Sequence, residues 1–546
     1  MRKNKSGNQQ QFLYLFVFIA GASTMALEMA ASRLLAPNFG TSLIVWANLI
    51  GLIMLALSVG YYLGGRLADR SPDVSILYGI GAGAGLYFSI IPSITRLILQ
   101  AVSRDIMGTP FYLTAGSFLA TLLVFFPPVV LLGIISPFSI RILANNLDRT
   151  GNTSGNLYAV STLGSLVGTF ASALFIIPTL GSRQTVYIFG FLLVTASVLG
   201  LGKRRFLLLP LIPLAMAWLG PTGIKTEPAT VYEKETPYQY VRILRNGEWL
   251  YLETNEGGGI QSSYHPTQFL TGWYSDYLLM LPYLRPADPQ KNVLVVGFAG
   301  GTIARQYHHL LRGAFKIDLE GVELDPEIAR LAGRYFGITG REGRVFVADG
   351  RIYLAQTRKR YDIIIVDAYS NQIYIPFHLA TREFFALTRK HLRPGGILAI
   401  NVNALESRSR ILQSIATTIR AVYPFTYVIS TGWSSLNYLV VASDSPVDPE
   451  ILASHMKNPS LGAVSRLFRA NFSSFTPVGL SSTALPTATA PSTLPGSPGA
   501  DASFPSRPAL VLTDNRAPLE FLTDAMVLGE LARTPGAPHP PAHRSK

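Results

Sequence analysis

Three acidic side chains each end a run of residues that is typical of a buried strand. Glu323 ends DLEGVE, Asp349 ends RVFVAD and Asp367 ends DIIIVD. A glycine-rich turn, residues 297–301 (GFAGG), follows the similar run VLVV and precedes a predicted helix. Ligands of open α/β sheets bind at the carboxyl ends of the strands, and an acid about 20 residues beyond a glycine turn is where a ribose diol is bound. Because glycines let a ligand approach the backbone, these four features together predict a nucleotide-type cofactor at one sheet edge.

The elements that position these side chains alternate between strand and helix from residue 291 onward. Such alternation predicts a parallel sheet with helices on both faces, which is a doubly wound α/β fold. Two later runs, FTYVIST and NYLVVAS, are expected to complete the sheet. The expected helices cover residues 302–313, 325–336, 378–392 and 405–421.

A small β domain, residues 223–288, is expected before this cofactor-binding domain, which we assign to 289–470. The runs TVYEKE, QYVRILRN and EWLYLET read as short strands, and Asn246-Gly247 between the last two is a strong hairpin signal. Residues 471–510 are rich in Ser, Thr, Pro and Ala, which cannot build a core, so we expect them to be disordered. Residues 511–546 are expected to form a short ordered return and a flexible tail.

The first 222 residues read as a transmembrane helical region of six or seven spans. A spanning helix needs ~20 mostly apolar residues. A seventh run, 206–219, is shorter and contains Pro210 and Pro213, so we expect it to be interfacial or re-entrant. The six longer runs lie near residues 12–32, 43–65, 74–95, 111–135, 155–177 and 184–201.

Composition agrees with a membrane protein. Only 14% of residues are charged, and the mean hydropathy is +0.30. The net charge of +14 comes largely from Lys and Arg in short loops between apolar runs, so it predicts contact with membrane lipids rather than with nucleic acid. The chain has no cysteine, which excludes disulfides, thiolate nucleophiles and cysteine metal sites.

The motifs around the predicted strand ends resemble one enzyme family. VLVVGFAGGT, VELDPEIARLAGRYF, ADG and IIIVDAYS with TREFFALTRKHLRPGGILAIN look like the spermidine synthase (polyamine aminopropyltransferase) family over roughly 229–445. The resemblance implies a methyltransferase-like (Rossmann-like) fold that binds decarboxylated S-adenosylmethionine, with S-adenosylmethionine as the other candidate. The membrane half, with GASTMALEMAASRLLAPNFG and GGRLADR, is similar to bacterial proteins that fuse a transporter-like helical region to such a domain.

The resemblance also implies individual roles for residues of this chain. Glu323 would bind the ribose hydroxyls, and Asp349 with Gly350 would face the adenine. Tyr274 would line the amine pocket, and Asp367 would be the acid beside the transferring group, so these two are the candidate catalytic residues. Further residues are implied to line or close over the cofactor: Gln239, Gln261, Gly297, Gly300 and Gly301.

Two departures from the family pattern leave the acceptor open. The family's glycine turn carries an acid that pairs with the cofactor amine, but this chain has Phe298-Ala299 there. A second aspartate expected three residues after Asp367 is Ser370, which cannot act as a carboxylate base. Three hypotheses follow: aminopropyl transfer to free putrescine, aminopropyl or methyl transfer to a lipid-linked or otherwise membrane-associated amine, and a non-catalytic nucleoside-sensing domain coupled to the bundle. Polyamine chemistry would be restored if another carboxylate, such as Asp276 or Glu520, entered the pocket.

The expected location is the inner (plasma) membrane, with the soluble domain on the cytoplasmic side where the cofactor is made. Loop charges favour an inside N-terminus, and six spans would then return the chain to the cytoplasm. Six or seven spans are few for a complete transporter, which leaves room for a homo-oligomer. Glu28 and Arg33 are expected to pair at the end of the first span. His308 and His309 lack the spacing of metal ligands, so no metal is expected. The inner basic residues are Arg2, Lys3, Lys5, Arg66, Arg70, Arg141, Arg149, Lys203, Arg204 and Arg205, against Arg33, Arg96, Arg104 and Arg183 outside.

Overall fold

The computed structural model describes most of the chain as two compact units. Unit 1 comprises residues 1–242, 254–257 and 534–546, and unit 2 comprises 243–253 and 258–533. The described residues are 2–39, 43–106, 115–144, 150–220, 229–255, 259–370, 374–432, 436–475, 509–523 and 526.

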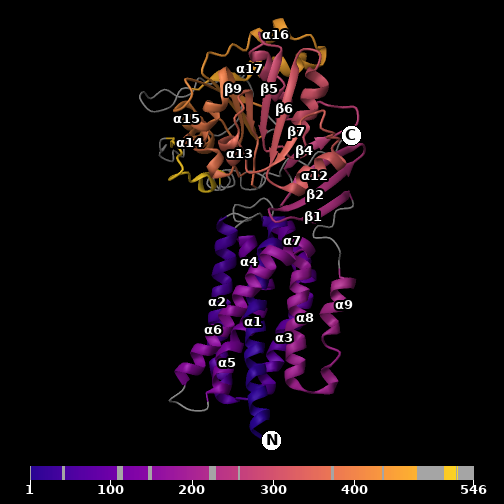
Figure 1. Ribbon diagram of the computed structural model, residues 1–546, viewed down its shortest axis with the longest axis vertical. Helices are drawn as coiled ribbons and strands as arrows, with labels where there is room; N and C mark the ends of the chain where they lie inside the picture. Colours follow the sequence, from indigo (N-terminus) through magenta and orange to yellow (C-terminus); the bar gives the residue numbers. More distant parts are fainter. Residues whose placement is uncertain are drawn as a thin grey trace, which may run out of the picture. The chain divides into compact units, whose positions relative to one another are not determined.

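Unit 1 contains a bundle of long apolar helices (Figure 1). Helix α1 packs against α6 and α8, α2 packs against α5, and α3 packs against α8. Their bounds are α1 Arg2–Phe39, α2 Leu43–Arg70, α3 Val74–Ile106, α4 Ser117–Val124, α5 Phe126–Leu143, α6 Thr150–Phe170, η3 Ala171–Ile176, α7 Ile177–Leu180, α8 Ser182–Leu201, η4 Arg204–Phe206 and α9 Leu211–Leu219.

Six helical segments are long and apolar enough to cross a membrane, as the sequence predicts. The fourth expected span is broken: α4 ends at Val124, and α5 begins at Phe126 with proline in its first turn. Proline lacks the N–H that would continue the helix, which explains the break. The six segments are Asn8–Phe39, Ile44–Arg70, Val74–Ile98, Phe126–Leu143, Gly151–Leu180 and Ser182–Leu201.

Glycines allow α1 and α6 to approach closely. A Cβ atom on Gly164 would lie 2.1 Å from the backbone oxygen of Phe18, and one on Gly168 would lie 2.2 Å from that of Ala22. This four-residue spacing of small residues is a recurrent way for membrane helices to pack. A larger side chain at either position would force the two helices apart.

The segment after α8 returns along the bundle. Arg183, at the start of α8, donates a hydrogen bond of 3.5 Å to the carbonyl of Gly220, just after α9, and Gln184 donates to Ala217. Helix α9 also packs on α3 and α8. Residues 202–220 therefore run back along α8. The expectation that 206–219 is interfacial or re-entrant stays a prediction, because this segment is not among the six helices long and apolar enough to span.

Strand β1 is attached to one end of the bundle within unit 1. The backbone N–H of Ser182 donates to Glu235 (2.5 Å), and the Ser182 hydroxyl donates to its other carboxylate oxygen (2.7 Å). The Arg33 guanidinium donates to the carbonyls of Thr236 (3.4 Å) and Pro237 (2.5 Å). The structure thus shows Arg33 bound to this turn, in addition to any contact with Glu28.

Four short strands form one antiparallel-type sheet in the order β1-β2-β3-β4. The hairpin between β2 and β3 turns at Gly247, whose φ of 59° needs a glycine, as the Asn-Gly signal predicts. The strands are β1 Thr230–Glu235, β2 Tyr240–Asn246, β3 Trp249–Thr254 and β4 Ile260–Tyr264.

Unit 2 contains an eight-stranded sheet in the order β12-β10-β11-β9-β8-β5-β6-β7 (Figure 1). Five strands, β5 to β9, are parallel where they pair. Strands β11, β10 and β12 add antiparallel pairs, so the sheet is mixed rather than wholly parallel as expected. The strands are β5 Gln290–Val296, β6 Lys316–Glu323, β7 Arg344–Val347, β8 Tyr361–Val366, β9 Leu392–Asn403, β10 Phe425–Ser430, β11 Asn437–Ser443 and β12 Phe472–Ser474.

Helices cover both faces of this sheet, which gives the doubly wound, methyltransferase-like fold. Alternate residues of β5 enter opposite cores: Val293 and Val295 lie in one, and Leu294 and Val296 lie in the other. This alternation is the period of two that a strand imposes. The helices are α10 Tyr274–Leu278, η5 Leu281–Leu284, α11 Thr302–Gln306, η6 Tyr307–Leu311, α12 Pro326–Tyr335, α13 Gly350–Gln356, η7 Phe377–Leu379, α14 Arg382–His391, α15 Arg410–Arg420, α16 Ile451–His455, η8 Pro459–Leu461 and α17 Gly462–Ala470.

The sequence analysis missed several elements of unit 2, namely α13, α16, α17 and β12. Strand β12 lies inside the expected disordered insert, so that insert cannot begin at residue 471. Residues 476–508 of the insert and the tail from 527 lie outside the described residues. The expected return is present: Leu512 and Leu519 are buried in a core of unit 2.

Candidate active site

The glycine turn lies where strands β5 and β8 end side by side. The N–H of Gly297 donates to the carbonyl of Val322 (2.9 Å), and the N–H of Asp367 donates to Val296 (2.8 Å). Gly297 has a φ of 88°, and a Cβ atom there would lie 2.4 Å from the Asp367 carbonyl oxygen. Only glycine fits this conformation and this distance. Gly301, with a φ of 84°, caps the start of α11.

Glu323 points back at the glycine turn. Its two carboxylate oxygens accept N–H groups from Ala299 (2.9 Å) and Asp325 (3.0 Å). Ala299 has a φ of 48°, which is unusual for a residue with a Cβ and marks strain at the turn. Burial raises the pKa of Glu323, and these hydrogen bonds only partly oppose it. The carboxylate is thus held rigidly at the strand end, as a ribose-binding acid requires.

Asp367 is held by two side chains from different elements. The Tyr274 hydroxyl donates to one carboxylate oxygen (2.8 Å), and the Asn401 amide donates to the other (2.9 Å). Burial raises the pKa of Asp367, and the two hydrogen bonds lower it by less. Burial, with the adjacent Asp367 charge, also raises the pKa of Tyr274, so the phenol stays protonated as a donor. The two candidate catalytic residues therefore form one hydrogen-bonded pair.

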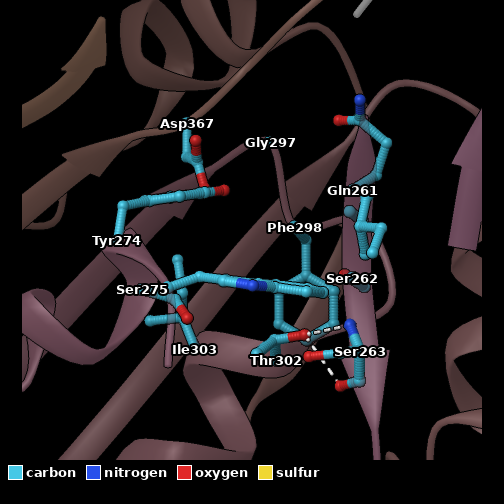
Figure 2. A pocket seen from close by; sticks show the side chains of 13 residues that line it. Gln261, Ser262, Ser263, Tyr274, Ser275, Gly297, Phe298, Thr302, Ile303 and Asp367 are labelled. Atoms are coloured by element: carbon cyan, nitrogen blue, oxygen red, sulfur yellow. Dashed lines mark hydrogen bonds between the residues drawn. The ribbon is translucent and has the colours of Figure 1, made fainter. Parts of the chain in front are cut away.

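Strand β4 is joined to the glycine turn by hydrogen bonds. The Ser262 hydroxyl accepts the Gly300 N–H (2.8 Å). Thr302 donates to the Ser263 carbonyl (3.0 Å) and accepts the Ser263 N–H (2.9 Å). These bonds place Gln261, the residue before Ser262, on the wall of a cavity that the glycine turn also lines (Figure 2).

One cavity brings together several of the predicted residues (Figure 2). It is narrow, with a volume of about 20 Å³, which is near the volume occupied by one water. Among the described residues that line it, Asp367 is the single carboxylate. The lining residues are Ile260, Gln261, Ser262, Ser263, Trp273, Tyr274, Ser275, Gly297, Phe298, Ala299, Thr302, Ile303 and Asp367.

Other predicted residues lie outside this lining. Asp349 caps α13 by accepting the N–H groups of Arg351 and Ile352, and its other oxygen lies 3.0 Å from Nε2 of His378. Gly350 lies close to Val296, because a Cβ there would be 2.3 Å from Cγ1 of that valine. Gln239 belongs to unit 1, in the β1–β2 turn. Glu323, Gly300 and Gly301 also lie outside the lining, and the cofactor roles of all the predicted residues stay predictions.

The structure also tests which carboxylate replaces the missing acid. Asp276 accepts N–H groups from Thr271 (2.9 Å) and Gly272 (2.8 Å) and the side-chain amide of Gln306 (2.6 Å). It is buried in its own turn and does not line the cavity, and Glu520 is exposed elsewhere. Ser370 uses its N–H and its hydroxyl on the carbonyl of Tyr374. Neither expected substitute is therefore placed at the cavity.

Sequence reasoning missed three side chains of the site: Asn401, His378 and Ser262. Asn401 lies near the carboxyl end of the parallel strand β9, so the criterion that identified the three acids would have found it had amides been included. Its own side chain accepts a bond of 2.9 Å from Asn437. Ser262 and His378 carry no comparable signal, because both reach the site through tertiary contacts.

The comparisons with known proteins match chiefly the C-terminal part of the chain. Residues 273–448 match the spermine/spermidine synthase domain family. A probable polyamine aminopropyl transferase of Bifidobacterium longum is 37% identical over 193 residues, which cover 35% of this chain and 42% of that protein. Polyamine aminopropyltransferase 2 of Streptomyces coelicolor is 25% identical over 463 residues, 79% of each chain. The C-terminal part of this chain is therefore a spermine/spermidine synthase domain.

Among solved structures, a probable spermidine synthase from Corynebacterium glutamicum aligns with a TM-score of 0.36 and 19% identity. The alignment covers 44% of this chain and 87% of that one. The chain spans less than half the length of the Bifidobacterium relative and about four fifths of the Streptomyces one.

Proposed function

We propose that the chain is a membrane-bound aminopropyltransferase that moves the aminopropyl group of decarboxylated S-adenosylmethionine to an amine acceptor. The observation that carries this proposal is the Tyr274–Asp367 pair in the same cavity as the glycine turn and Gln261. In the reaction the acceptor nitrogen attacks the carbon attached to the sulfonium. The C–N bond forms as the C–S bond breaks, methylthioadenosine leaves, and the acceptor nitrogen loses a proton.

Asp367 is the group that takes that proton. A carboxylate whose pKa is raised by burial is a better base than an ordinary aspartate, and amines are mostly protonated at neutral pH. Tyr274 and Asn401 occupy one lone pair on each oxygen and so hold the carboxylate in one orientation. Asn401 is a positioning residue in this proposal.

Glu323 supports the nucleoside part of the proposal. Its oxygens each accept one N–H and can accept a ribose hydroxyl as well, because a carboxylate has about four lone-pair sites. Glycines in the adjacent turn let it pack closely against Asp367 and Ser262. Glu323 and the glycine turn would hold S-adenosylmethionine equally well. Which of the two molecules is the donor is therefore a question for measurement.

The acceptor is proposed to present one amine on a partly apolar body, such as a lipid-linked amine. Free putrescine carries two ammonium groups, and burying the second without a partner is costly. The described lining offers one carboxylate, Asp367, beside Trp273, Ile303 and Phe298. At the position where the family has an acid, this chain has Ser370, whose hydroxyl donates to the Tyr374 carbonyl. That position therefore offers no negative charge to a second ammonium group.

The test uses the full chain purified in lipid and measures methylthioadenosine release from decarboxylated S-adenosylmethionine. Putrescine and vesicles containing phosphatidylethanolamine are compared as acceptors. Faster release with the amine lipid is expected, and Ser370→Asp should shift preference toward putrescine. Rapid turnover of putrescine by the native chain, unchanged in Ser370→Asp, would show that the acceptor proposal is wrong. Binding of methylthioadenosine without any turnover would favour the alternative, a nucleoside-sensing domain coupled to the bundle.

We further propose that the N-terminus and strand β1 lie on opposite sides of the membrane. Arg33, near the end of α1, contacts the turn after β1, and residue 8 lies ~38 Å away along the same helix at 1.5 Å per residue. The return of residues 202–220 supplies the additional crossing. Because the loop charges favour an inside N-terminus, this arrangement places strand β1 outside and differs from the cytoplasmic placement expected from six spans.

The absence of native cysteine makes this topology easy to test. Lys203→Cys and Tyr238→Cys lie on exposed positions before and after the returning segment. A membrane-impermeant maleimide on intact cells is expected to label the second and not the first. Equal labelling of both would mean that residues 202–220 do not cross.

A further inference from the structure

Two histidines and a glutamate meet outside the catalytic cavity. His308 and His309 lie in η6, and Glu342 follows the loop after α12. One ligand atom from each residue lies within 4.8 Å of the other two. The sequence analysis dismissed the histidines because no carboxylate was near them in the chain. Folding supplies that carboxylate from more than thirty residues away.

The three side chains are held in place by neighbours that do not occupy all of their ligand atoms. The His309 ring stacks on Phe269, with centroids 4.1 Å apart and planes 15° apart. The His308 ring meets it edge-on at 4.9 Å. Thr339 orients Glu342 through its N–H (2.8 Å) and its hydroxyl (3.1 Å), both to one carboxylate oxygen. Such supporting contacts are what keep ligands in a geometry ready for a metal.

The local backbone and cavity are further observations. Residues Tyr307–Leu311 form a single π-helical turn, which places successive side chains differently from an α-helix and is frequent at functional sites. His308 and Glu342 line a cavity of about 530 Å³, which is open to solvent. Arg312, Lys316 and Arg341 line the same cavity.

We propose that His308, His309 and Glu342 bind a divalent ion of the zinc class, with the fourth coordination position open to the cavity. Two imidazoles and one carboxylate are a ligand set that zinc uses when it keeps an open position. The basic residues around the cavity favour an anionic fourth ligand, such as chloride or phosphate, which would balance the charge of the ion. The site is separate from the Asp367 cavity, and its ion takes no chemical part in the proposed transfer reaction.

Metal binding at this site acts on the loop that carries the catalytic tyrosine. Phe269, stacked on His309, lies in the same loop as Trp273 and Tyr274. Gln306, just before η6, donates to the Phe269 carbonyl (3.0 Å) and to Asp276 (2.6 Å). Fixing the His309 ring therefore restrains the loop that leads to Tyr274.

The test measures zinc uptake by the full chain, purified without a histidine tag and stripped with a chelator. His539 and His543 of the tail are replaced in every protein, since they are other possible ligands. Titration calorimetry is expected to give one ion per chain. His309→Asn and Glu342→Gln should each weaken binding at least tenfold, whereas His455→Gln, an exposed histidine in α16, should leave it unchanged.

A second measurement separates loss of the site from loss of the fold. Thermal unfolding in chelator should be the same for the native chain and for Glu342→Gln, and zinc should raise the unfolding temperature of the native chain alone. No saturable uptake by the native chain, or uptake that survives both substitutions, would overturn the proposal. So would an equal rise in unfolding temperature in all variants.

Discussion

Strand β6 carries two buried glutamates that have different environments. Glu320 lies in the middle of the strand and accepts hydrogen bonds from Lys359, Tyr361 and Tyr353. Burial alone raises the pKa of Glu320, but these partners lower it below its ordinary value. The charge is matched by Lys359 and by Arg344, which lies 3.2 Å away, and two tyrosine hydroxyls donate to the other oxygen. Glu320 is thus an acid whose partners are all internal to the fold.

Glu323, three residues further along the chain, is the last residue of the same strand. Its partners are backbone N–H groups, no cation is among them, and its pKa is raised by burial. The comparison teaches how to separate a structural acid from a candidate functional one. Cationic side chains neutralise the charge of the structural acid. The functional acid keeps lone pairs that can accept hydrogen bonds from a ligand at the edge of the sheet. Asp367 belongs with Glu323 by this criterion.

The largest expected effect is on Asp367→Asn. If Asp367 is the base, its loss should reduce turnover by about 10²–10⁴-fold, the usual contribution of a general base. Methylthioadenosine release measures this. In the native chain, turnover should rise with pH through a value above the ordinary aspartate pKa, since the base form is needed. A variant with native turnover would remove Asp367 from the mechanism.

The same substitution should stabilise the fold at neutral pH. The folded pKa of Asp367 is raised, so below the ordinary value of ~3.9 both states are protonated and the charge costs nothing. Above it the unfolded state ionises first, and stability falls as pH rises through the folded pKa. Asp367→Asn removes that loss, so the unfolding temperature of the variant should exceed the native one at pH 7 but not at pH 3. An unfolding temperature below the native one at pH 7 would contradict this.

Glu323→Gln should weaken nucleoside binding by ~1.5–3 kcal/mol, the value of a hydrogen bond to a charged group, which is about 10- to 150-fold. Calorimetry with methylthioadenosine, decarboxylated S-adenosylmethionine and S-adenosylmethionine measures it and identifies the donor. The fold should be unaffected or slightly more stable at pH 7, because a buried charge without a cation is removed. If none of the three ligands binds the native chain, Glu323 is not a cofactor residue.

Glu320→Gln is the matched control for Glu323→Gln on the same strand. It should lower the free energy of unfolding by ~1–3 kcal/mol, because Lys359 and two tyrosines lose a charged acceptor. Nucleoside affinity should stay within about twofold of native once the protein is folded. Denaturant unfolding measures the free energy of unfolding of both variants, and calorimetry measures their nucleoside affinity. If Glu320→Gln weakens the nucleoside as much as Glu323→Gln, the distinction between the two acids fails.

The smallest effect is expected for Asp514→Asn in the C-terminal return. Asp514 accepts two bonds from Arg351 and one from Thr381, and the hydrogen bonds from Arg351 lower its pKa to about 2. Both charged groups are partly exposed, so solvent screening limits the loss to ~0.5–1 kcal/mol. Stability from this pair is present above the ordinary aspartate pKa and is lost as the pH falls toward 2. If the free energy of unfolding of the variant falls at acid pH as steeply as that of the native chain, the Arg351–Asp514 pair is not the source of this stability.

Most of the fold was predictable from local patterns. The alternation of strand and helix, the six long apolar runs and the Asn246-Gly247 hairpin each depend on residues close in the chain. The mixed sheet was not predicted, because an antiparallel strand and a parallel one have the same apolar pattern when both faces are buried. The path of residues 202–220 along α8 was not predicted either. Its helix is short and the segment contains two prolines, so only the tertiary contacts with α8 define that path.

What the sequence determined by itself is the set of groups at the strand ends. Glu323, Asp367 and the glycine turn lie at the ends of buried strands, Asp349 follows the mostly exposed edge strand β7, and parallel strands bring their carboxyl ends to one edge whatever the loops do. The tertiary structure alone decided which partners those groups meet. Asn401 beside Asp367, Ser262 at the glycine turn, the withdrawal of Asp276 into its own turn and Glu342 beside His308 all join residues far apart in the chain. Such contacts depend on how helices and loops pack across the sheet, and no local pattern encodes that packing.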